Sequence, residues 1–191
     1  RKFANRDQYR TLNWTGTFEE YLEIVRQRPQ VTRNAFQRIY DMIVSWGQDE
    51  ITRHKRSLYR YKFFSDPIEG GRDAVFGLEE PLMRFVGVLK SAAEGFGTEK
   101  RVILLHGPVG SSKSTIARVL KRGVEEYSKS PEGACYTYSW NFPDKVTLHD
   151  GTSLFGQIRS PLHEEPLKLI PQELRAQLFP TLSGSSGFAI P

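Results

Sequence analysis

The chain has 191 residues and a mass of 21.9 kDa, which is enough for one globular domain with a short attachment but not for two domains of ordinary size. Apolar residues make up 38% of it and charged residues 26%, so it can build a hydrophobic core and is not disordered as a whole. The single cysteine, Cys135, excludes an internal disulfide and a metal site made of several thiolates. No stretch approaches the roughly 18 apolar residues of a membrane span, and the start lacks the apolar stretch of a signal peptide. We therefore expect a soluble cytoplasmic protein without a membrane contact.

The net charge of +5 is concentrated in the first third of the chain. Residues 1–62 contain 13 Lys and Arg against 7 Asp and Glu, whereas residues 63–191 contain 14 against 15. The densest basic run, residues 53–62, also carries Tyr59 and Tyr61. Such a run can bind nucleic acid, because aromatic rings stack on bases, and it can also bind a protein partner. We favour a solvated helical face or linker and do not expect a nucleic-acid partner.

Two basic amphipathic helices are predicted near the start of the chain. Thr17 followed by Glu20 forms a capping-box pattern, and apolar residues then recur at helical spacing until Pro29. Asn34, or Thr32 just before it, can cap a second helix whose apolar residues again lie on one face. These patterns indicate a short helical segment in front of the main domain.

The boundary between this segment and the main domain is placed after residue 62. Residues 1–62 are assigned to a basic helical N-terminal segment, and residues 63–191 to the main domain. Residues 63–71 contain Asp66-Pro67 and Gly70-Gly71, which predict an extended piece that runs into a loop. We expect the main domain to begin at this loop.

Helices and strands alternate in the main domain as they do in α/β proteins. A helix is predicted from Glu79 to Gly95, and the apolar run at residues 101–106 suits a strand that is buried on both faces of a sheet. Helical spacing returns from Lys113 to Tyr127, and aromatic and β-branched residues at 135–140 predict a second strand. The predicted fold is a parallel sheet with flanking helices.

The pattern is weaker beyond Asn141. A turn is predicted at Asp150-Gly151, and residues 167–178 suggest a helix despite Pro171. Residues 181–191 are rich in Gly and Ser and show no periodicity, so we expect a loose end.

One motif carries recognisable chemistry. The segment Gly107-Pro108-Val109-Gly110-Ser111-Ser112-Lys113-Ser114 follows the predicted strand and opens a helix, which is the setting of a Walker A loop. In such a loop, backbone N–H groups surround phosphates and the helix N-terminus faces them with its partial positive charge. Lys113 would reach the β- and γ-phosphates, and the Ser114 hydroxyl would bind Mg²⁺. The motif therefore predicts that the chain binds ATP and Mg²⁺.

Ser112 departs from the Walker A pattern, which has glycine before the lysine. If this position needs a positive φ angle, serine costs on the order of 1 kcal/mol there. That strain would weaken phosphate binding without preventing it. The alternative is a chance glycine turn between a strand and a helix, which we set aside because both elements and the Lys113-Ser114 pair agree.

The acidic residue that would complete a hydrolysis site is missing. Mg²⁺ and the nucleophile usually need a carboxylate at the end of a second buried strand, and no apolar run followed by Asp occurs. Asp144 is the nearest candidate, but Asn141-Phe-Pro separates it from the predicted strand, so we do not expect it to bind the metal. Asp150 fits a turn, and Glu164-Glu165 fits a solvated loop.

Three stretches together carry a family resemblance. They are Ala-Val-Phe-Gly-Leu-Glu-Glu-Pro-Leu at residues 74–82, the loop at residues 107–114, and His-Glu-Glu-Pro-Leu-Lys-Leu-Ile-Pro at residues 163–171. The arrangement resembles the AAA+ ATPases and, in detail, the bacterial PrkA family of serine protein kinases with an AAA+ domain. The resemblance implies that Val75 and Gly77 contact adenine and that Gly107 to Thr115 contact the phosphates.

The resemblance also implies a function and a larger protein. It implies a P-loop NTPase fold of the AAA+ type and a cytoplasmic, ATP-dependent protein serine kinase in stress or developmental signalling. The family's acidic strand end, sensor residues and C-terminal kinase-like region are not found here, so we expect the N-terminal part of such a protein, truncated before the acidic strand. A protein substrate and a homo-oligomer are the expected partners. An ATPase that remodels a protein partner, and a non-enzymatic module for nucleotide-gated oligomerisation or docking, remain alternatives.

Overall fold

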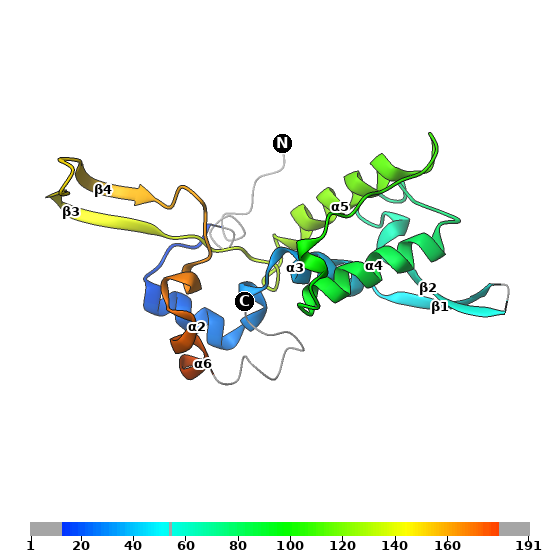
Figure 1. Ribbon diagram of the computed structural model, residues 1–191, viewed down its shortest axis with the longest axis horizontal. Helices are drawn as coiled ribbons and strands as arrows, with labels where there is room; N and C mark the ends of the chain where they lie inside the picture. The colour runs from blue at the N-terminus through cyan, green and yellow to red at the C-terminus, as the bar shows by residue number, and fades with distance from the viewer. Residues whose placement is uncertain (1–12, 54, 180–191) are drawn as a thin grey trace.

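The computed structural model describes residues 13–53 and 55–179, which form a row of helices with a β-hairpin projecting from each end (Figure 1). The helices are α2 (Phe18–Gln27), α3 (Ala35–Ser45), α4 (Glu79–Ala93), α5 (Lys113–Tyr127) and α6 (Gln172–Leu178). The strands are β1 (Gln48–Arg53), β2 (Arg56–Tyr61), β3 (Ser139–Thr147) and β4 (Ser153–Arg159). Short 3₁₀ helices lie at Pro29–Thr32, Lys62–Ser65, Thr98–Lys100 and Pro166–Leu169. The end predicted to be loose, residues 181–191, lies outside the described residues.

Both predicted N-terminal helices are confirmed. At the start of α2, the Glu20 N–H donates to the Thr17 hydroxyl (3.3 Å), and the Thr17 N–H donates to the Glu20 carboxylate (2.8 Å). α3 begins after Asn34 rather than Thr32, with the same reciprocal bonding to Gln37. These caps satisfy N–H groups that have no partner within the helix.

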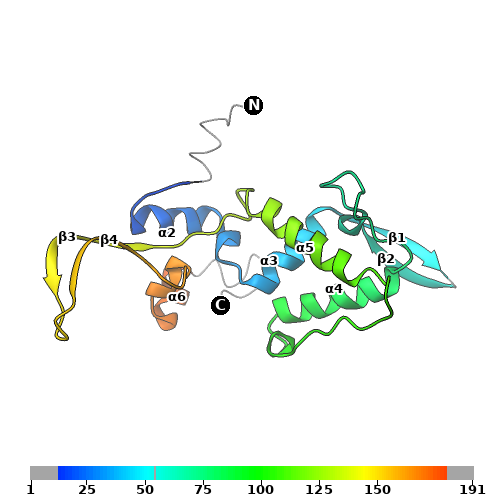
Figure 2. The same ribbon diagram turned by 90° about the horizontal axis from the view of Figure 1, so that it is seen from above.

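The larger hydrophobic cluster forms where α3 packs against both α4 and α5 (Figures 1 and 2). Its buried members are Met42, Ile43, Phe63, Phe64, Val75, Leu82, Val86, Leu89, Ile116 and Val119. Residues on both sides of position 62 contribute to it, and the division of the chain at that position stays a prediction. The predicted helices after Glu79 and from Lys113 are both confirmed.

Close packing in this cluster depends on a glycine within α5. A Cβ atom at Gly123 would lie 2.6 Å from the ring of Phe63 and 2.7 Å from the sulfur of Met42. Both of these side chains are completely buried and have little room to move. The absence of a side chain at position 123 therefore lets α5 approach α3 this closely.

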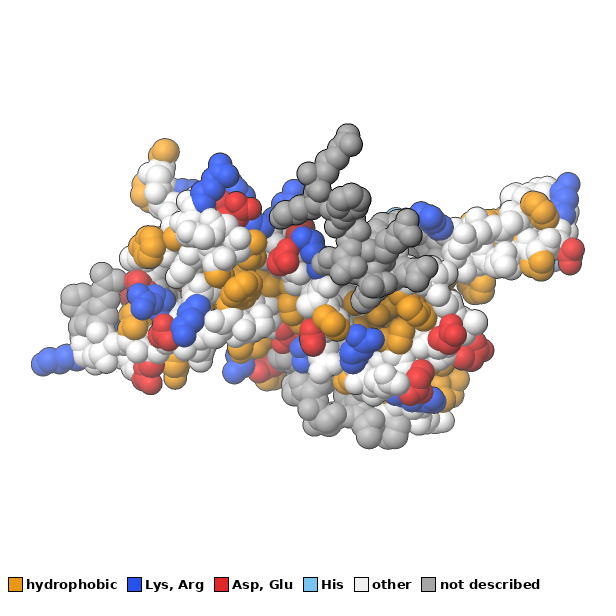
Figure 3. Space-filling view, turned by 180° about the vertical axis from the view of Figure 1, so that it is seen from behind, with side chains coloured by type: hydrophobic (Ala, Val, Ile, Leu, Met, Phe, Trp, Pro, Cys, Tyr) orange, Lys and Arg blue, Asp and Glu red, His pale blue; other side chains and the backbone are white. Residues whose placement is uncertain are grey.

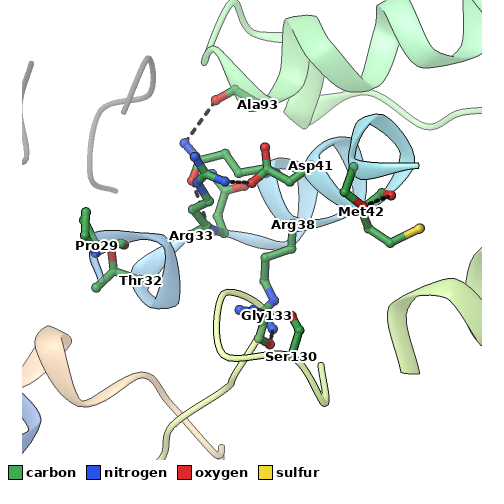
Figure 4. Close-up of polar contacts among 12 residues, drawn as sticks. Pro29, Thr32, Arg33, Arg38, Asp41, Met42, Ala93, Ser130 and Gly133 are labelled. Atoms are coloured by element: carbon green, nitrogen blue, oxygen red, sulfur yellow. Dashed lines mark hydrogen bonds and ion pairs between the residues drawn. The ribbon is translucent and has the colours of Figure 1, made fainter. Parts of the chain in front are cut away.

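Two buried polar side chains of α3 bind carbonyl groups next to the ends of the neighbouring helices (Figure 4). Gln37 Nε2 donates to the carbonyl of Ala93, the last residue of α4 (3.2 Å). Arg38 reaches past the end of α5 and donates to the carbonyls of Gly133 and Ala134. The Ala93 carbonyl lies in the last turn of α4 and needs a partner outside the helix. Together with the Arg38 contacts, this bond fixes α3 relative to α4 and to the turn after α5.

A second, smaller cluster joins α2 to the C-terminal part of the chain. Its buried members are Tyr21, Val25, Val31, Leu167, Ile170 and Phe179. The helix predicted over residues 167–178 is present in two pieces, a 3₁₀ helix and α6, which meet at Pro171. Proline lacks an N–H group and restricts the residue before it, so one continuous helix cannot form there.

The sheets differ from the predicted parallel sheet. β1 pairs with β2 and β3 pairs with β4, both antiparallel, and the described residues contain no parallel strand pair. The interpretation of the basic run at residues 53–62 as a helical face or linker is wrong, because most of it belongs to the β1–β2 hairpin. Helices and strands are mixed, and a parallel sheet of the P-loop type is not confirmed.

The predicted strand at residues 101–106 is not formed. This segment pairs with no strand among the described residues, and its apolar side chains face solvent, with Val102 94% and Leu104 80% exposed. A strand requires a neighbour for its backbone N–H and C=O groups. Residues 101–106 are apolar, but they form no buried strand because no neighbouring strand pairs with them among the described residues.

The second predicted strand begins later than expected. β3 starts at Ser139 rather than Cys135 and runs into the long β3–β4 hairpin, whose turn contains Asp150-Gly151 as predicted. Figure 3 shows hydrophobic side chains on the surface of this hairpin. Trp140 of β3 is half-exposed and Phe155 of β4 is exposed. Within the described ranges, no helix has the length and apolar character needed to cross a membrane.

We predict that Gly123→Ala lowers the free energy of unfolding by about 1–3 kcal/mol, because the added methyl group overpacks the contact with Phe63 and Met42. Gly87→Ala in α4 is the matched control, since no atom outside the backbone of its own helix lies within 4 Å of its Cβ position. Helix propensity should make this control more stable by up to about 1 kcal/mol. Urea unfolding of both variants measures the difference. Equal stabilisation by the two substitutions would contradict the proposed close packing.

Candidate functional site

The predicted phosphate loop lies directly before α5 and is closed by the side chain of Lys113, the first residue of that helix. Its Nζ atom donates to the carbonyls of Gly107 (2.8 Å) and Pro108 (2.6 Å) and to the Ser111 hydroxyl (2.9 Å). The ammonium group therefore lies inside the loop, where three oxygen atoms surround it.

Ser112 has the strained backbone conformation that the sequence raised as a possibility. Its φ and ψ angles are 58° and 14°, in the left-handed region, and its carbonyl accepts the Ile116 N–H (2.8 Å). Within the described residues, the Ser112 side chain makes no capping hydrogen bond to α5. A left-handed residue directly before a helix places successive N–H groups around a small concavity that suits an anion. The first turn of α5 thus presents N–H groups to the loop.

The other loop residues form a tight turn. A Cβ atom at Gly107 would lie 2.8 Å from the Ser111 hydroxyl oxygen, so a side chain at position 107 would fill the turn. Gly110 has a φ angle of 84°, and Val109 is fully exposed at the tip. Ser114 is exposed. Of these loop residues, Gly107, Pro108 and Ser111 are the ones whose oxygen atoms contact the Lys113 ammonium.

The two residues expected on the adenine side lie in the segment that leads into α4. Val75 is buried, and its N–H donates to the Phe64 carbonyl (2.8 Å), while Gly77 has a φ angle of 74°. A surface hollow beside Val75 is lined by Tyr59, Arg60, Tyr61, Phe64, Ser65, Phe76, Glu79 and Leu82. The hollow therefore has aromatic walls, formed by Tyr59 and Tyr61 of β2 and by Phe64 and Phe76.

The hollow and the predicted phosphate loop are separate. Of the described residues that line the hollow, none belongs to residues 107–115. α4 and α5 nevertheless begin at the same end of the row of helices, next to the β1–β2 hairpin (Figures 1 and 2). Both predicted parts of the site therefore lie toward one end of the larger cluster.

Four charged residues that the sequence did not indicate connect α5 to the loop before Val75. Arg122 donates to both oxygens of Asp66 (3.1 and 3.2 Å) and to Asp73 (2.7 Å), and Arg118 donates to Asp73 (2.7 Å). The hydrogen bond from Arg122, together with the charge of Arg118, lowers the pKa of the Asp73 carboxyl. The i, i+4 spacing of the two arginines places them on one helix face. Their acidic partners are distant in sequence, so no local signal identifies them.

The acidic residues considered for a metal role lie elsewhere. Asp144 belongs to the β3–β4 hairpin, at the opposite end of the molecule from the start of α5 (Figure 1). Asp150 is a turn residue, as predicted: the Thr152 N–H donates to its carboxylate (2.9 Å) and lowers its pKa. Within the described part of the chain, no three His, Cys, Asp or Glu side chains are grouped as metal ligands would be.

The prediction that Glu165 lies in a solvated loop is wrong. Its carboxylate accepts hydrogen bonds from the buried Tyr21 hydroxyl and from the Leu167 N–H (3.1 Å). Burial raises the pKa of Glu165 to about 7. The neighbouring Glu164 instead lies at the surface opposite Lys168 (3.9 Å). Glu165 thus joins the C-terminal segment to α2.

Comparison with known proteins identifies related sequences. The family model described as PrkA AAA domain matches residues 16–184. The chain is 35% identical over 175 residues to the Bacillus subtilis (strain 168) protein named ATP-dependent protease PrkA. The matching region covers 91% of this chain and 23% of that protein. It is 29% identical over 108 residues to the Escherichia coli (strain K12) protein named serine/threonine kinase YeaG, covering 55% of this chain and 16% of that protein.

A third relative covers about half of the chain. An uncharacterized Geobacillus stearothermophilus protein, named for the gldA 5′ region, is 38% identical over 99 residues, or 51% of this chain and 91% of that protein. No solved structure matches the chain. The chain spans less than a quarter of the two longer relatives, whose names give different activities, a protease and a kinase.

We predict that Ser112→Gly raises the free energy of unfolding by about 0.5–1 kcal/mol, which is the strain relieved less the entropy that glycine adds to the unfolded chain. Ser111→Gly is the matched control, because Ser111 donates to the Pro108 carbonyl (2.8 Å) and its φ angle is not positive. This control should lose stability. Denaturant unfolding measures both changes, and a destabilised Ser112→Gly variant would show that the serine hydroxyl matters more than the strain.

We predict that Glu165 makes the folded state less stable as the pH rises from about 5 to 8. Its pKa is higher in the folded chain, about 7 against 4.5, so the folded state binds the proton more tightly and loses this advantage on ionisation. The loss is at most about 3–4 kcal/mol, since one pKa unit corresponds to about 1.4 kcal/mol. Glu165→Gln should remove this part of the pH dependence, whereas Glu164→Gln should retain it. Chemical unfolding at a series of pH values is the measurement, and identical pH profiles for the two variants would contradict the prediction.

Proposed function

The chain belongs to the PrkA AAA domain family, and from this premise we propose that it binds Mg·ATP through residues 107–115. The observation that carries the proposal is the turn at Ser112, which directs the start of α5 toward the loop that holds the Lys113 ammonium. A helix N-terminus with a neighbouring ammonium group is a general arrangement for binding phosphate.

The loop residues fit a chain of phosphate groups. The Lys113 ammonium already binds three oxygen atoms, and phosphate oxygens are acceptors of the same kind with more negative charge. Gly107 leaves the turn free of a side chain that would occupy it. In this proposal the N–H groups of residues 110–115 hold the phosphates and the Ser114 hydroxyl is a ligand of Mg²⁺. The bound ion would neutralise phosphate charge.

The hollow beside Val75 is proposed as the site of the adenine base. Tyr59, Tyr61 and Phe76 offer aromatic surface there, and Val75 and Leu82 offer apolar surface. The hollow itself has room for about one water molecule, so in this proposal the planar base lies across its aromatic and apolar rim. Gly77, which lies two residues after Val75, would approach the base with its backbone.

The catalytic activity of the full-length protein is a proposal separate from nucleotide binding. We propose that the full-length protein transfers the γ-phosphoryl group of ATP to serine residues of a protein, which is favoured by the name of the YeaG relative. A second candidate is an ATPase that acts on a protein partner, which the name ATP-dependent protease favours. Both activities need Mg·ATP, so the binding proposal does not depend on which is correct. A cytoplasmic location, a homo-oligomer and a role in stress signalling belong to the same proposal.

We predict that Lys113→Ala lowers the affinity for Mg·ATP by about 10- to 100-fold, because a charge-assisted contact with phosphate is lost. Lys121→Ala is the matched control, since Lys121 lies on the exposed face of the same helix opposite Glu125. It should bind as tightly as the parent. Isothermal titration calorimetry measures all three affinities, and equal binding by the Lys113 variant would contradict the phosphate-loop assignment.

The same variants separate the candidate activities in the full-length protein. Radioactive γ-phosphate should appear on serine of a protein substrate if the protein is a kinase, and as free phosphate alone if it is an ATPase. Either signal should be lost in Lys113→Ala and retained in Lys121→Ala. ATP binding without either signal would favour a non-enzymatic module for nucleotide-gated oligomerisation or docking.

A further inference from the structure

The segment that carries Val75 is a loop closed on itself. Its two ends are tied by the hydrogen bond from the Val75 N–H to the Phe64 carbonyl (2.8 Å). Inside the loop, the Asp66 carbonyl accepts the Gly71 N–H (2.8 Å), and the Asp66 carboxylate accepts the Asp73 N–H (2.9 Å). Asp66 therefore organises the loop from within through both its backbone and its side chain.

The Asp66 carboxylate also requires a partner from outside the loop. Its side chain is fully buried, with 0% of its surface exposed, and a buried carboxylate is unfavourable unless it is paired. Arg122 of α5 supplies this partner through one nitrogen, Nη1, and uses its second nitrogen, Nη2, to bind Asp73. Arg118, one turn earlier on α5, binds the other oxygen of Asp73.

These contacts join the two proposed parts of the nucleotide site. Lys113 is the first residue of α5, and the two arginines follow on the same rigid helix. Asp73 lies two residues before Val75, which lines the hollow. A continuous series of short contacts thus runs from the phosphate-loop helix through Arg122 and Asp73 to the proposed base site.

Apolar packing alone would not set this spacing. Ile116 and Val119 of α5 already share the larger cluster with Val75, and apolar contacts tolerate sliding and rotation more than hydrogen bonds do. The planar guanidinium group of arginine holds two carboxylates in fixed directions, which an ammonium group does not do.

We propose that Arg122, supported by Arg118, is a positioning residue that sets the spacing between the phosphate loop and the base hollow of the nucleotide site. The inference rests on the proposed function, because it assigns the two ends of one ligand to these places. It implies that loss of the arginine contacts weakens binding of a ligand that reaches both places. A ligand that touches only the loop should be affected little.

The test compares Mg·ATP with inorganic tripolyphosphate, which has the phosphates but no base, by calorimetry on the full-length protein. Arg122→Lys keeps the charge beside Asp66 but loses the two-armed contact. It should lower ATP affinity by about tenfold and tripolyphosphate affinity by less than about twofold. Arg118→Gln should give a smaller loss that is again confined to ATP. Lys121→Gln removes a charge from the exposed face of the same helix and should change neither affinity.

Other patterns of affinity overturn the proposal. Equal losses for ATP and tripolyphosphate, or no loss, would show that the arginines support the fold alone. If Arg122→Lys does not fold, Arg118→Gln decides, because the Arg118 side chain is 57% exposed and its removal leaves Asp66 paired. A parent protein that binds neither ligand would overturn the proposed function itself. A parent that binds tripolyphosphate as tightly as ATP would retain the phosphate loop and remove the base site.

Discussion

The contact of α5 with Phe63 and Met42 at Gly123 is the packing constraint on which the candidate site depends. Hydrophobic burial brings helices together without direction, and the size of the side chains between them sets their distance. Since position 123 has no side chain, α5 lies directly against two completely buried residues of the larger cluster. The loop that precedes α5 is attached to the start of this helix. Its position is therefore a consequence of packing at the far end of the helix.

Polar contacts then fix what apolar packing leaves open. Gln37 and Arg38 bind carbonyls at the end of α4 and beyond the end of α5, whereas Arg122, which directly precedes Gly123 on α5, binds two carboxylates of the loop before Val75. Because hydrogen bonds weaken steeply with distance and angle, these groups resist both sliding and rotation of the helices. α5 is thus held by close packing at Gly123, by Arg118 and Arg122 on the helix itself, and by the contact of Arg38 with the turn beyond its C-terminus. This arrangement suits a helix whose N-terminus is proposed to bind phosphate.

The sequence predicted the features whose causes are local. The cap at Thr17, and Asn34 as one of two candidate caps of the second helix, depend on neighbours three residues away, and the structure contains both. The sequence leaves open whether Ser112 has a positive φ angle, and the structure shows that it has. The sequence did not predict features that depend on residues far away in the chain. The apolar run at residues 101–106 has the composition of a buried strand, but pairing depends on another segment that no local pattern supplies. Glu165 likewise resembled a solvated residue because its partner, the Tyr21 hydroxyl, lies on α2.

The strained conformation of Ser112 links the anchoring of α5 to the chemistry of the loop. A left-handed serine is unfavourable by about 1–2 kcal/mol and persists only where the surroundings over-determine it. At one side the turn is closed by Lys113 and Ser111, and at the other α5 is held by Arg122 and by close packing at Gly123. Relaxing Ser112 would turn the first N–H groups of the helix away from the loop and would break contacts on both sides. The same contacts that fix α5 in the fold therefore keep its N-terminus directed at the place where we propose that phosphate binds.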